Sequence, residues 1–184
     1  MPLILIKEDG SGLSNSNSYA DASDGDAYYD GHLYATTWTA ATTGNKEKAL
    51  VMATRLIDSL CHFHGFRVKV TQSLQWPREQ CPDPDKASVP YTPLAVILND
   101  FVDPTTVPKP IVQATCEMAK ELLLLDRTTA PPGEGLFATW NSTDGTKYSK
   151  FDARPILSHV AQAMLSKFGS LINERSGTVR LIRV

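Results

Sequence analysis

Cysteine is scarce in this sequence: the three that are present, Cys61, Cys81 and Cys116, are an odd number and form no Cys-x-x-Cys pair. This argues against a disulfide framework and predicts reduced, mostly buried thiols. A basic excess is also missing, because 18 lysines and arginines face 20 acidic residues and the formal net charge is −2. Proteins whose main task is to coat nucleic acid usually carry a clear positive charge, so the composition disfavours that class.

Long apolar runs are missing as well. None approaches the roughly 20 residues that a membrane-spanning helix needs. The first ten residues, "MPLILIKEDG", lack both the basic start and the longer apolar centre of a signal peptide. We therefore expect a protein of the cytosol, or one that is assembled there. A chain of 184 residues with 42% hydrophobic content is long enough for one domain with its own core.

Groups of residues typical of catalysis or metal binding are hard to find. The best metal candidate is "CHFH", where Cys61, His62 and His64 lie together and Cys81 is a fourth ligand to consider. Zinc sites of this kind normally use two pairs of ligands, each separated by two to four residues. We therefore favour a half-buried cysteine beside surface histidines over a metal centre.

No other segment offers a better site. The "DPD" at 83–85 is too short for a calcium loop, and Ser158 and His159 are helix neighbours that point in different directions. The glycines of "PPGEGLF" have no strand before them and no helix after them, unlike those of a phosphate-binding loop. The sequence therefore predicts a protein that is not an enzyme and that uses no metal or other cofactor.

Two helices are strongly predicted. Apolar residues recur at helical spacing over 44–60, with Thr42 or Thr43 as the N-cap, and again from Lys109 to about residue 125, with Pro110 in the first turn. Eight prolines between 66 and 110 exclude a helix of any length from that stretch.

The remaining patterns are weaker, and they complete a mainly α fold. We expect a small helical bundle of three long helices and one short one, with a few short strands, a long Pro-rich connector and an extended C-terminal arm. The domain is predicted to span 1–175, with the Pro-rich loop 81–108 inserted, and the arm 176–184. The weaker elements are a strand at 3–6, a short helix at 24–33 capped by Ser23, a hairpin around Asp144 and Gly145, and a third long helix at 155–168.

Charge is distributed unevenly along the chain. Residues 1–30 carry a net charge of −5, whereas the stretch from 145 to the end carries +5. Identical subunits joined head to tail in a ring would bring these oppositely charged parts together. Chance patterning of solvated faces explains the same gradient equally well.

Aromatic residues raise the alternative of base stacking, as in proteins that bind single-stranded nucleic acid. The candidates are Tyr28, Tyr29, Tyr34, Trp38 and Trp76. A stacking platform works beside a basic groove, however, and residues 1–45 contain only one positive charge, Lys7. Aromatic residues at helical spacing are more often part of a core, which is the interpretation that we favour.

The segment "SLQWPREQC", residues 73–81, lines up large side chains where prolines forbid a helix. It is either a loop anchored to the core or a surface that a partner grips, and we favour the anchor. Burial of Leu74 and Trp76 between long helices, with Pro77 holding the backbone extended, would contribute about 3 to 5 kcal/mol. Arg78 is then placed to bond carbonyls or acids of a neighbouring helix.

The order of these segments resembles a family of tailed-phage proteins labelled DnaT-like single-stranded DNA-binding proteins. The resemblance rests on "SYADASDGDAYY", "WTAATTGNKEKALVMATRLIDSL", "GFRVKVTQSLQWPRE" and "VPKPIVQATCEMAKELL", which follow one another between Ser18 and Leu123, and on the ending "SGTVRLIRV". The Pro-rich insertion is longer than the family pattern suggests, and "VP" replaces "IP". These departures leave the role of the loop open.

The resemblance implies a head–tail connector, or adaptor, in the neck of a phage virion. Such adaptors form a ring, commonly dodecameric, beneath the portal and join it to the tail or its stopper. Genomic DNA passes through the channel without sequence recognition, and assembly takes place in the host cytoplasm. The alternative is a single-stranded DNA-binding accessory protein of replication. The charge pattern favours the connector.

The basic tail is the part that we expect to make contact with the portal or with a neighbouring subunit. A strand with apolar residues on both faces tends to add to a sheet edge or to lie in a groove. Lys147 and Lys150 are candidates for lining the DNA channel. The residues predicted to bind the portal or the neighbour are Val179, Arg180, Leu181, Ile182, Arg183 and Val184.

Overall fold

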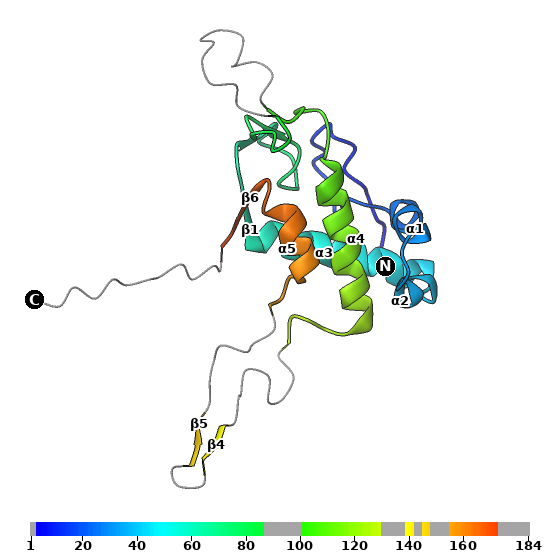
Figure 1. Ribbon diagram of the computed structural model, residues 1–184. Helices are drawn as coiled ribbons and strands as arrows, with labels where there is room; N and C mark the ends of the chain where they lie inside the picture. The colour runs from blue at the N-terminus through cyan, green and yellow to red at the C-terminus, as the bar shows by residue number, and fades with distance from the viewer. Residues whose placement is uncertain (1–2, 87–100, 130–138, 142–144, 148–154, 173–184) are drawn as a thin grey trace, which may run out of the picture.

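The structure is a computed structural model that describes residues 3–86, 101–129, 139–141, 145–147 and 155–172 (Figure 1). This part of the chain contains five helices and three two-stranded antiparallel sheets. The helices are α1 (Ala22–Asp30), α2 (Thr36–Thr39), α3 (Thr43–Leu60), α4 (Lys109–Leu124) and α5 (His159–Leu165). The strands are β1 (Cys61–Phe63), β2 (Phe66–Arg67), β3 (Arg78–Glu79), β4 (Thr139–Asn141), β5 (Gly145–Lys147) and β6 (Gly169–Leu171).

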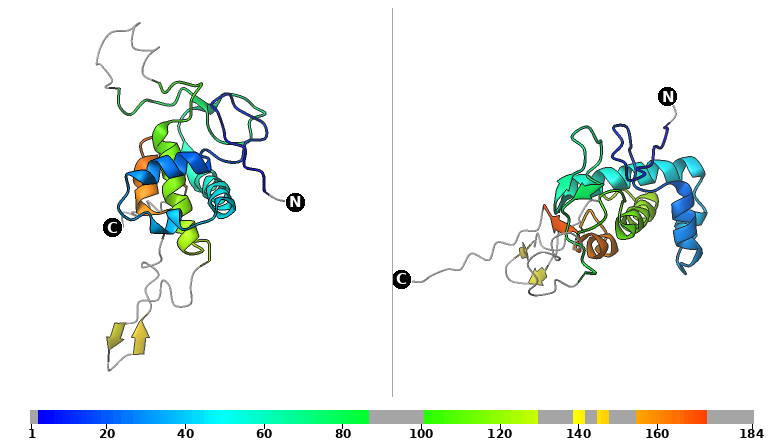
Figure 2. Two further views of the ribbon diagram at one scale, coloured as in Figure 1. Left: turned by 90° about the vertical axis from the view of Figure 1, so that its right-hand side faces the viewer. Right: turned by 90° about the horizontal axis from the view of Figure 1, so that it is seen from above.

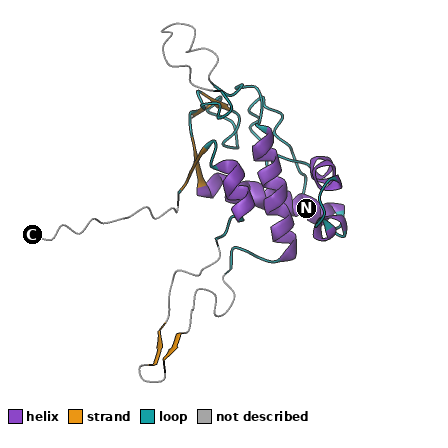
Figure 3. Cartoon of the chain, viewed as in Figure 1, coloured by secondary structure: helices purple, strands orange, loops and turns teal. Residues whose placement is uncertain are grey.

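The core forms where α3 and α4 cross, as Figures 1 and 3 show at the centre of the molecule. Both helices were expected from their apolar spacing, and both are confirmed. The Thr42 side chain accepts a hydrogen bond from the Asn45 N–H, which caps α3 as predicted. The fully buried side chains at the centre are Leu50, Ala53 and Ile57 of α3 and Ile111, Ala114 and Met118 of α4.

The first helix begins two residues earlier than predicted. Its N-cap is Asp21, whose side chain accepts from the Asp24 N–H while the Asp24 side chain accepts from the Asp21 N–H. This reciprocal capping box replaces the expected cap at Ser23. The residue that α1 turns into the core is Tyr29, and the helix approaches Trp38 so closely that only glycine fits at position 25.

The predicted fold class, a mainly α bundle with three long helices, is wrong. The structure is mixed α/β, with two long helices, α3 and α4, in the part that it describes. The third predicted helix, 155–168, is reduced to the seven residues of α5. It starts after Ser158, whose hydroxyl accepts a hydrogen bond from the Ala161 N–H. The residues that follow α5 leave the helix, and β6 pairs with β1.

The pairing of β1 with β6 depends on a close approach of the two backbones. A Cβ atom at Gly169 would lie 2.3 Å from the carbonyl oxygen of His62, so a side chain at this position is excluded. The helical pattern of apolar residues extends to Phe168 in the sequence, whereas the helix ends at Leu165 and the strand β6 begins at Gly169. Figure 2 shows the two strands beside α5, on the side of the molecule opposite α1.

The predicted strand at 3–6 is also wrong. The Ile6 N–H donates to the side chain of Asn17 instead of to a neighbouring strand. The next residues form a loop around the carboxylate of Glu8, which is 2% exposed and accepts hydrogen bonds from the N–H of Gly12 at 2.8 Å and of Leu13 at 3.0 Å. Backbone hydrogen bonds to residues 17 and 18 leave only an isolated bridge between Lys7 and Ser18 in place of a strand.

The hairpin expected around Gly145 is confirmed, because β4 and β5 pair in antiparallel register there. The Pro-rich loop is described only at its two ends, where Pro82 and Phe101 form an isolated bridge. The division into a domain at 1–175 and an arm at 176–184 stays a prediction. The arm, with its predicted contact residues, lies outside the described residues.

One further observation concerns membranes. Among the residues that the structure describes, no helix is both long enough and apolar enough to cross a bilayer.

Candidate functional site

The segment 74–78 is built into the core. Leu74, Trp76, Pro77 and Arg78 are all buried. The indole ring of Trp76 meets the rings of Phe63 and Phe168 edge to face, at centroid distances of 5.7 and 5.8 Å. Trp76 therefore lies at the end of α5 beside β1, and its peptide bond to Pro77 is cis. The predicted role of these residues as a loop anchor stays a prediction that stability measurements can test.

Arg78 binds carbonyl groups of a turn rather than a helix. Its guanidinium donates to the carbonyl oxygens of His64 at 2.7 Å and Gly65 at 2.6 Å, and further bonds reach Phe63 and Gln75. Burial lowers the pKa of this side chain from its ordinary value. The planar guanidinium thus ties the turn after β1 to segment 74–78.

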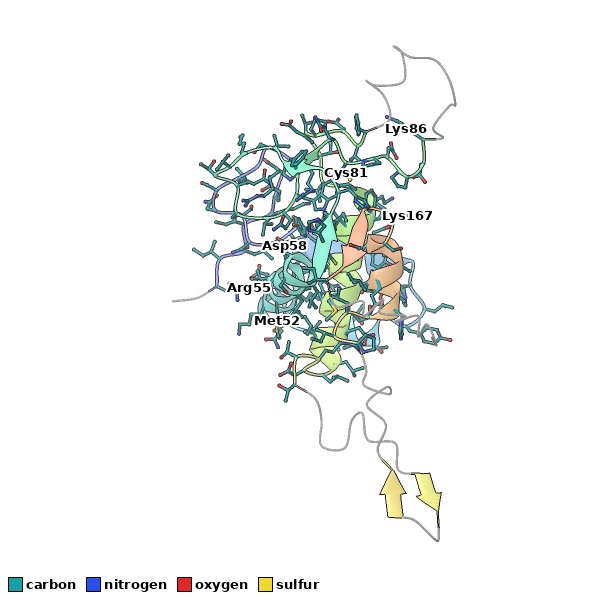
Figure 4. All side chains as sticks on the ribbon, turned by 90° about the vertical axis from the view of Figure 1, so that its left-hand side faces the viewer. Met52, Arg55, Asp58, Cys81, Lys86 and Lys167 are labelled. Carbon is teal, nitrogen blue, oxygen red and sulfur yellow. The ribbon has the colours of Figure 1, made fainter. Side chains whose placement is uncertain are left out.

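A buried polar network fixes the same segment to α3. The hydroxyl of Tyr19, which is fully buried, donates to the Asp58 carboxylate. That carboxylate also accepts from the Gln75 N–H at 3.0 Å, and the Tyr19 oxygen accepts from the Trp76 N–H at 3.2 Å. Figure 4 shows Asp58 in a row with Met52 and Arg55 along α3.

The network makes stability depend on pH with a definite sign. Burial raises the pKa of Asp58 to about 6, although the hydrogen bonds from Tyr19 and Gln75 act in the opposite direction. An unfolded aspartic acid titrates near pH 4, so between about pH 4 and pH 6 the folded protein binds more protons than the unfolded chain. The stabilisation is complete below about pH 4 and is lost as the pH rises through 6.

We therefore expect the free energy of unfolding of the wild-type protein, relative to that of Asp58→Asn, to fall by about 2 kcal/mol between pH 4 and pH 7. Urea unfolding at several pH values measures this difference directly. Other carboxylates affect both proteins equally and cancel in the comparison. Parallel stability curves for the two proteins would contradict the assignment.

The cysteine and histidine residues do not assemble a metal site. Cys61 and Cys81 are buried, whereas His62 and His64 are exposed. Burial raises the pKa of the Cys61 thiol to about 12, so the thiol is protonated. No group of three or more potential metal ligands occurs among the described residues.

Most of the aromatic side chains considered for base stacking are in the core. Tyr29, Trp38 and Trp76 are at most 2% exposed. Tyr28 is half-buried and its hydroxyl donates to Glu117. Tyr34 alone of these five is well exposed. The core interpretation accounts for the other four.

An exposed aromatic residue that sequence analysis missed lies in β2. Phe66 is 69% exposed, and the exposed cations Arg67 and Lys69 follow it. Its strand partner is an acid, Glu79. The alternation of aromatic and basic residues in "FRVK" was the signal that could have found this surface.

Many other cations of the described part are neutralised within the chain. Lys7 and Lys46 pair with acids of α1, and Lys120 and Arg127 pair with acids of α4. Lys86 pairs with Asp83. Other exposed cations of the described residues, namely Lys48, Arg55, Lys109 and Lys167, form no salt bridge within this part of the chain.

The family comparison now adds an independent observation. The family model described as "Putative DnaT-like ssDNA binding protein" matches residues 1–135, which is more than half of the chain. The chain belongs to this family. No curated protein and no solved structure matches it significantly.

The match to the DnaT-like family covers α1 to α4 and the whole of segment 74–78. It ends before β4, so α5, β6 and the C-terminal arm lie beyond it. The expected resemblance to the family is thereby confirmed. The family description does not mention a head–tail connector, so the more specific expectation of a connector is not supported by the match.

Two further acidic groups went unnoticed in the sequence. Asp58 lies in α3, and its partner Tyr19 lies on a loop 39 residues earlier in the chain. Glu8 lies in a charged turn that is typical of a surface. The bond between Asp58 and Tyr19 joins residues that are far apart in the chain, whereas the bonds to Glu8 come from its own loop.

Lys147 ends β5, and Lys150 lies outside the described residues. Their place at a DNA channel stays a prediction.

Proposed function

We propose that this member of the DnaT-like family acts by adhesion rather than by catalysis, as a structural head–tail connector of a phage virion. In this role identical subunits form a ring, in number commonly twelve by resemblance, between the portal protein and a tail-side stopper or terminator protein. Genomic DNA passes through the ring without sequence recognition. The protein would reside in the neck of the virion after assembly in the host cytoplasm.

The observation that carries this proposal is the burial of the aromatic side chains, together with the pairing of the two lysines that lie over them. Tyr29, Trp38 and Trp76 serve the core. Lys46 lies over the Trp38 ring and pairs with Asp26, and Lys120 lies over the Tyr29 ring and pairs with Glu117. A rigid body with these properties is suited to holding other proteins. The opposite charges of residues 1–30 and of the stretch from 145 onward also favour contact between copies.

Single-stranded DNA binding is the second candidate, and the family comparison favours it over the connector. The family's description names this activity directly. The described surface contributes one matching feature, because Phe66 is exposed beside Arg67 and Lys69. Stacking of a base on one aromatic ring is worth about 1 to 3 kcal/mol, and cations beside it attract the phosphates.

One experiment separates the two candidates. A labelled poly-dT oligonucleotide is titrated with the protein at about 0.15 M salt, and fluorescence anisotropy is recorded. The connector predicts no binding tighter than about 10 μM, which lies in the range of non-specific contacts. Tighter binding that Phe66→Ala weakens at least about tenfold, while Tyr34→Ala leaves it unchanged, would establish the second candidate and contradict the first.

A further inference from the structure

One edge of the sheet formed by β1 and β6 is open among the described residues. In this antiparallel pair His62 stands opposite Ser170, and the flanking bonds run from His64 N–H to the Phe168 carbonyl and from Ile172 N–H to the Leu60 carbonyl. Alternation along the strand then turns the backbone N–H and C=O groups of Gly169 and Leu171 away from β1. The described residues provide no hydrogen-bond partner for these groups.

A groove lies along the same strand. It has a volume of about 430 Å³ and is lined on one side by Gly169, Ser170 and Leu171 of β6 and on the other by His159, Gln162 and Ala163 of α5. The buried side chains of Cys61 and Leu165 also contribute to its lining. Figure 4 shows β6 between β1 and α5, so the groove is bounded by a strand edge and a helix.

This combination is one that proteins use to bind an extended peptide. The free N–H and C=O groups of the edge pair with the peptide backbone, and the pocket beside the helix takes every second side chain. The occupant must therefore be a strand with apolar side chains at alternate positions. Uncapped strand edges of this kind are otherwise prone to non-specific pairing.

The chain itself carries a segment of that chemistry. Residues 178–184, "TVRLIRV", place Val179 and Leu181 on one side of an extended backbone and Ile182 and Val184 on the other. The segment begins six residues after Ile172, an apolar side chain that is 59% exposed at the end of β6. It contains arginines and no acid.

We propose that the groove between β6 and α5 binds residues 178–184 of a second copy of this chain, as an added β-strand. The choice of a second copy rests on the proposed function, because every subunit carries both this edge of β6 and this segment. Exchange between copies links each subunit to the next, whereas pairing of the segment with its own subunit would leave no link. In a closed ring, the groove of each subunit would bind the segment of one neighbour, and its own segment would bind the groove of the other neighbour.

Mixing two variants that each carry one added cysteine tests the proposal. Ser170→Cys and Arg180→Cys are made in chains with tags of different length, mixed in equal amounts and oxidised. We expect a disulfide between the two chains as the main product. Because side chains of a strand alternate, Leu181→Cys in place of Arg180→Cys should change the yield severalfold in one direction or the other. Chains that lack both added cysteines control for the native thiols.

Sedimentation of the full chain and of a chain that ends at residue 177 gives the second measurement. We expect the truncation to weaken self-association at least tenfold while circular dichroism remains that of the folded protein. Three results would overturn the inference. The first is equal self-association of the full and the truncated chain, and the second is an equal disulfide yield for cysteines at 180 and 181. The third is a double variant, Ser170→Cys with Arg180→Cys, that stays monomeric and forms the disulfide within one chain. Rings of the truncated chain on the portal would refute the exchange but leave the connector standing.

Discussion

Replacing Trp76 with alanine should lower the free energy of unfolding by about 3 to 5 kcal/mol, the largest loss that we expect from one side chain. The indole is fully buried and meets Phe63 and Phe168 edge to face. Truncation would leave a cavity between β1 and the end of α5, and the aromatic contacts would be lost as well. Urea denaturation followed by circular dichroism measures the change.

Two companion variants show whether packing causes the loss. Phe66→Ala removes a ring of similar size that is 69% exposed, so its cost should stay below about 1 kcal/mol. Trp76→Phe keeps an aromatic ring and removes the indole N–H, which has no hydrogen-bond partner among the described residues. Its cost should therefore be less than half that of Trp76→Ala. Equal losses at 66 and 76 would show that segment 74–78 is not an anchor.

Arg78→Ala should have the second-largest effect, a loss of about 3 kcal/mol. The guanidinium satisfies the carbonyl oxygens of Phe63, His64 and Gly65, and the alanine variant would leave these acceptors without their donor. Burying acceptors without a donor costs about 1 to 3 kcal/mol for each group that water does not reach. Thermal and urea unfolding both report the difference.

Arg67 offers a matched control, because it stands directly opposite Arg78 in the β2–β3 pair but is exposed. Arg67→Ala should cost less than about 1 kcal/mol. Arg78→Lys keeps the charge but lacks the planar fork, so most of the loss should persist. Full stability of the lysine variant would mean that charge alone matters, against the geometry described above.

The parts of the fold that the sequence predicts are those determined by local patterns. The apolar stripe over 44–60 and the stripe from Lys109 onward each bury one face of a helix, and a cap or a proline marks where each begins. The hairpin at Gly145 follows from turn chemistry. Such signals depend on residues close together in the chain, which explains why they could be read without the structure.

The parts that were mispredicted depend on distant contacts. The apolar pattern over 155–168 continues past Leu165, but the pairing of β6 with β1 competes with the helix and prevails. Before the helix, the Arg127 guanidinium holds the carbonyl oxygens of Pro155 and Ile156, which also keeps them outside it. Neither partner can be identified from the spacing of apolar residues.

The candidate site divides in the same way. Leu74, Trp76 and Arg78 stood out because large side chains beside proline have few structural roles. Their partners did not, because Asp58 and Tyr19 come from elements that meet only in three dimensions. Most acceptors of Arg78 are backbone carbonyl groups, and because every residue has one, the residue types do not indicate which of them bind Arg78.

Electron microscopy of the protein mixed with a phage portal protein tests the connector most directly. The account predicts an additional ring of density on the tail-facing end of the portal, which is lost when residues 176–184 are removed. The account would be contradicted if the portal showed no additional density while the same protein preparation bound a single-stranded oligonucleotide in the same buffer.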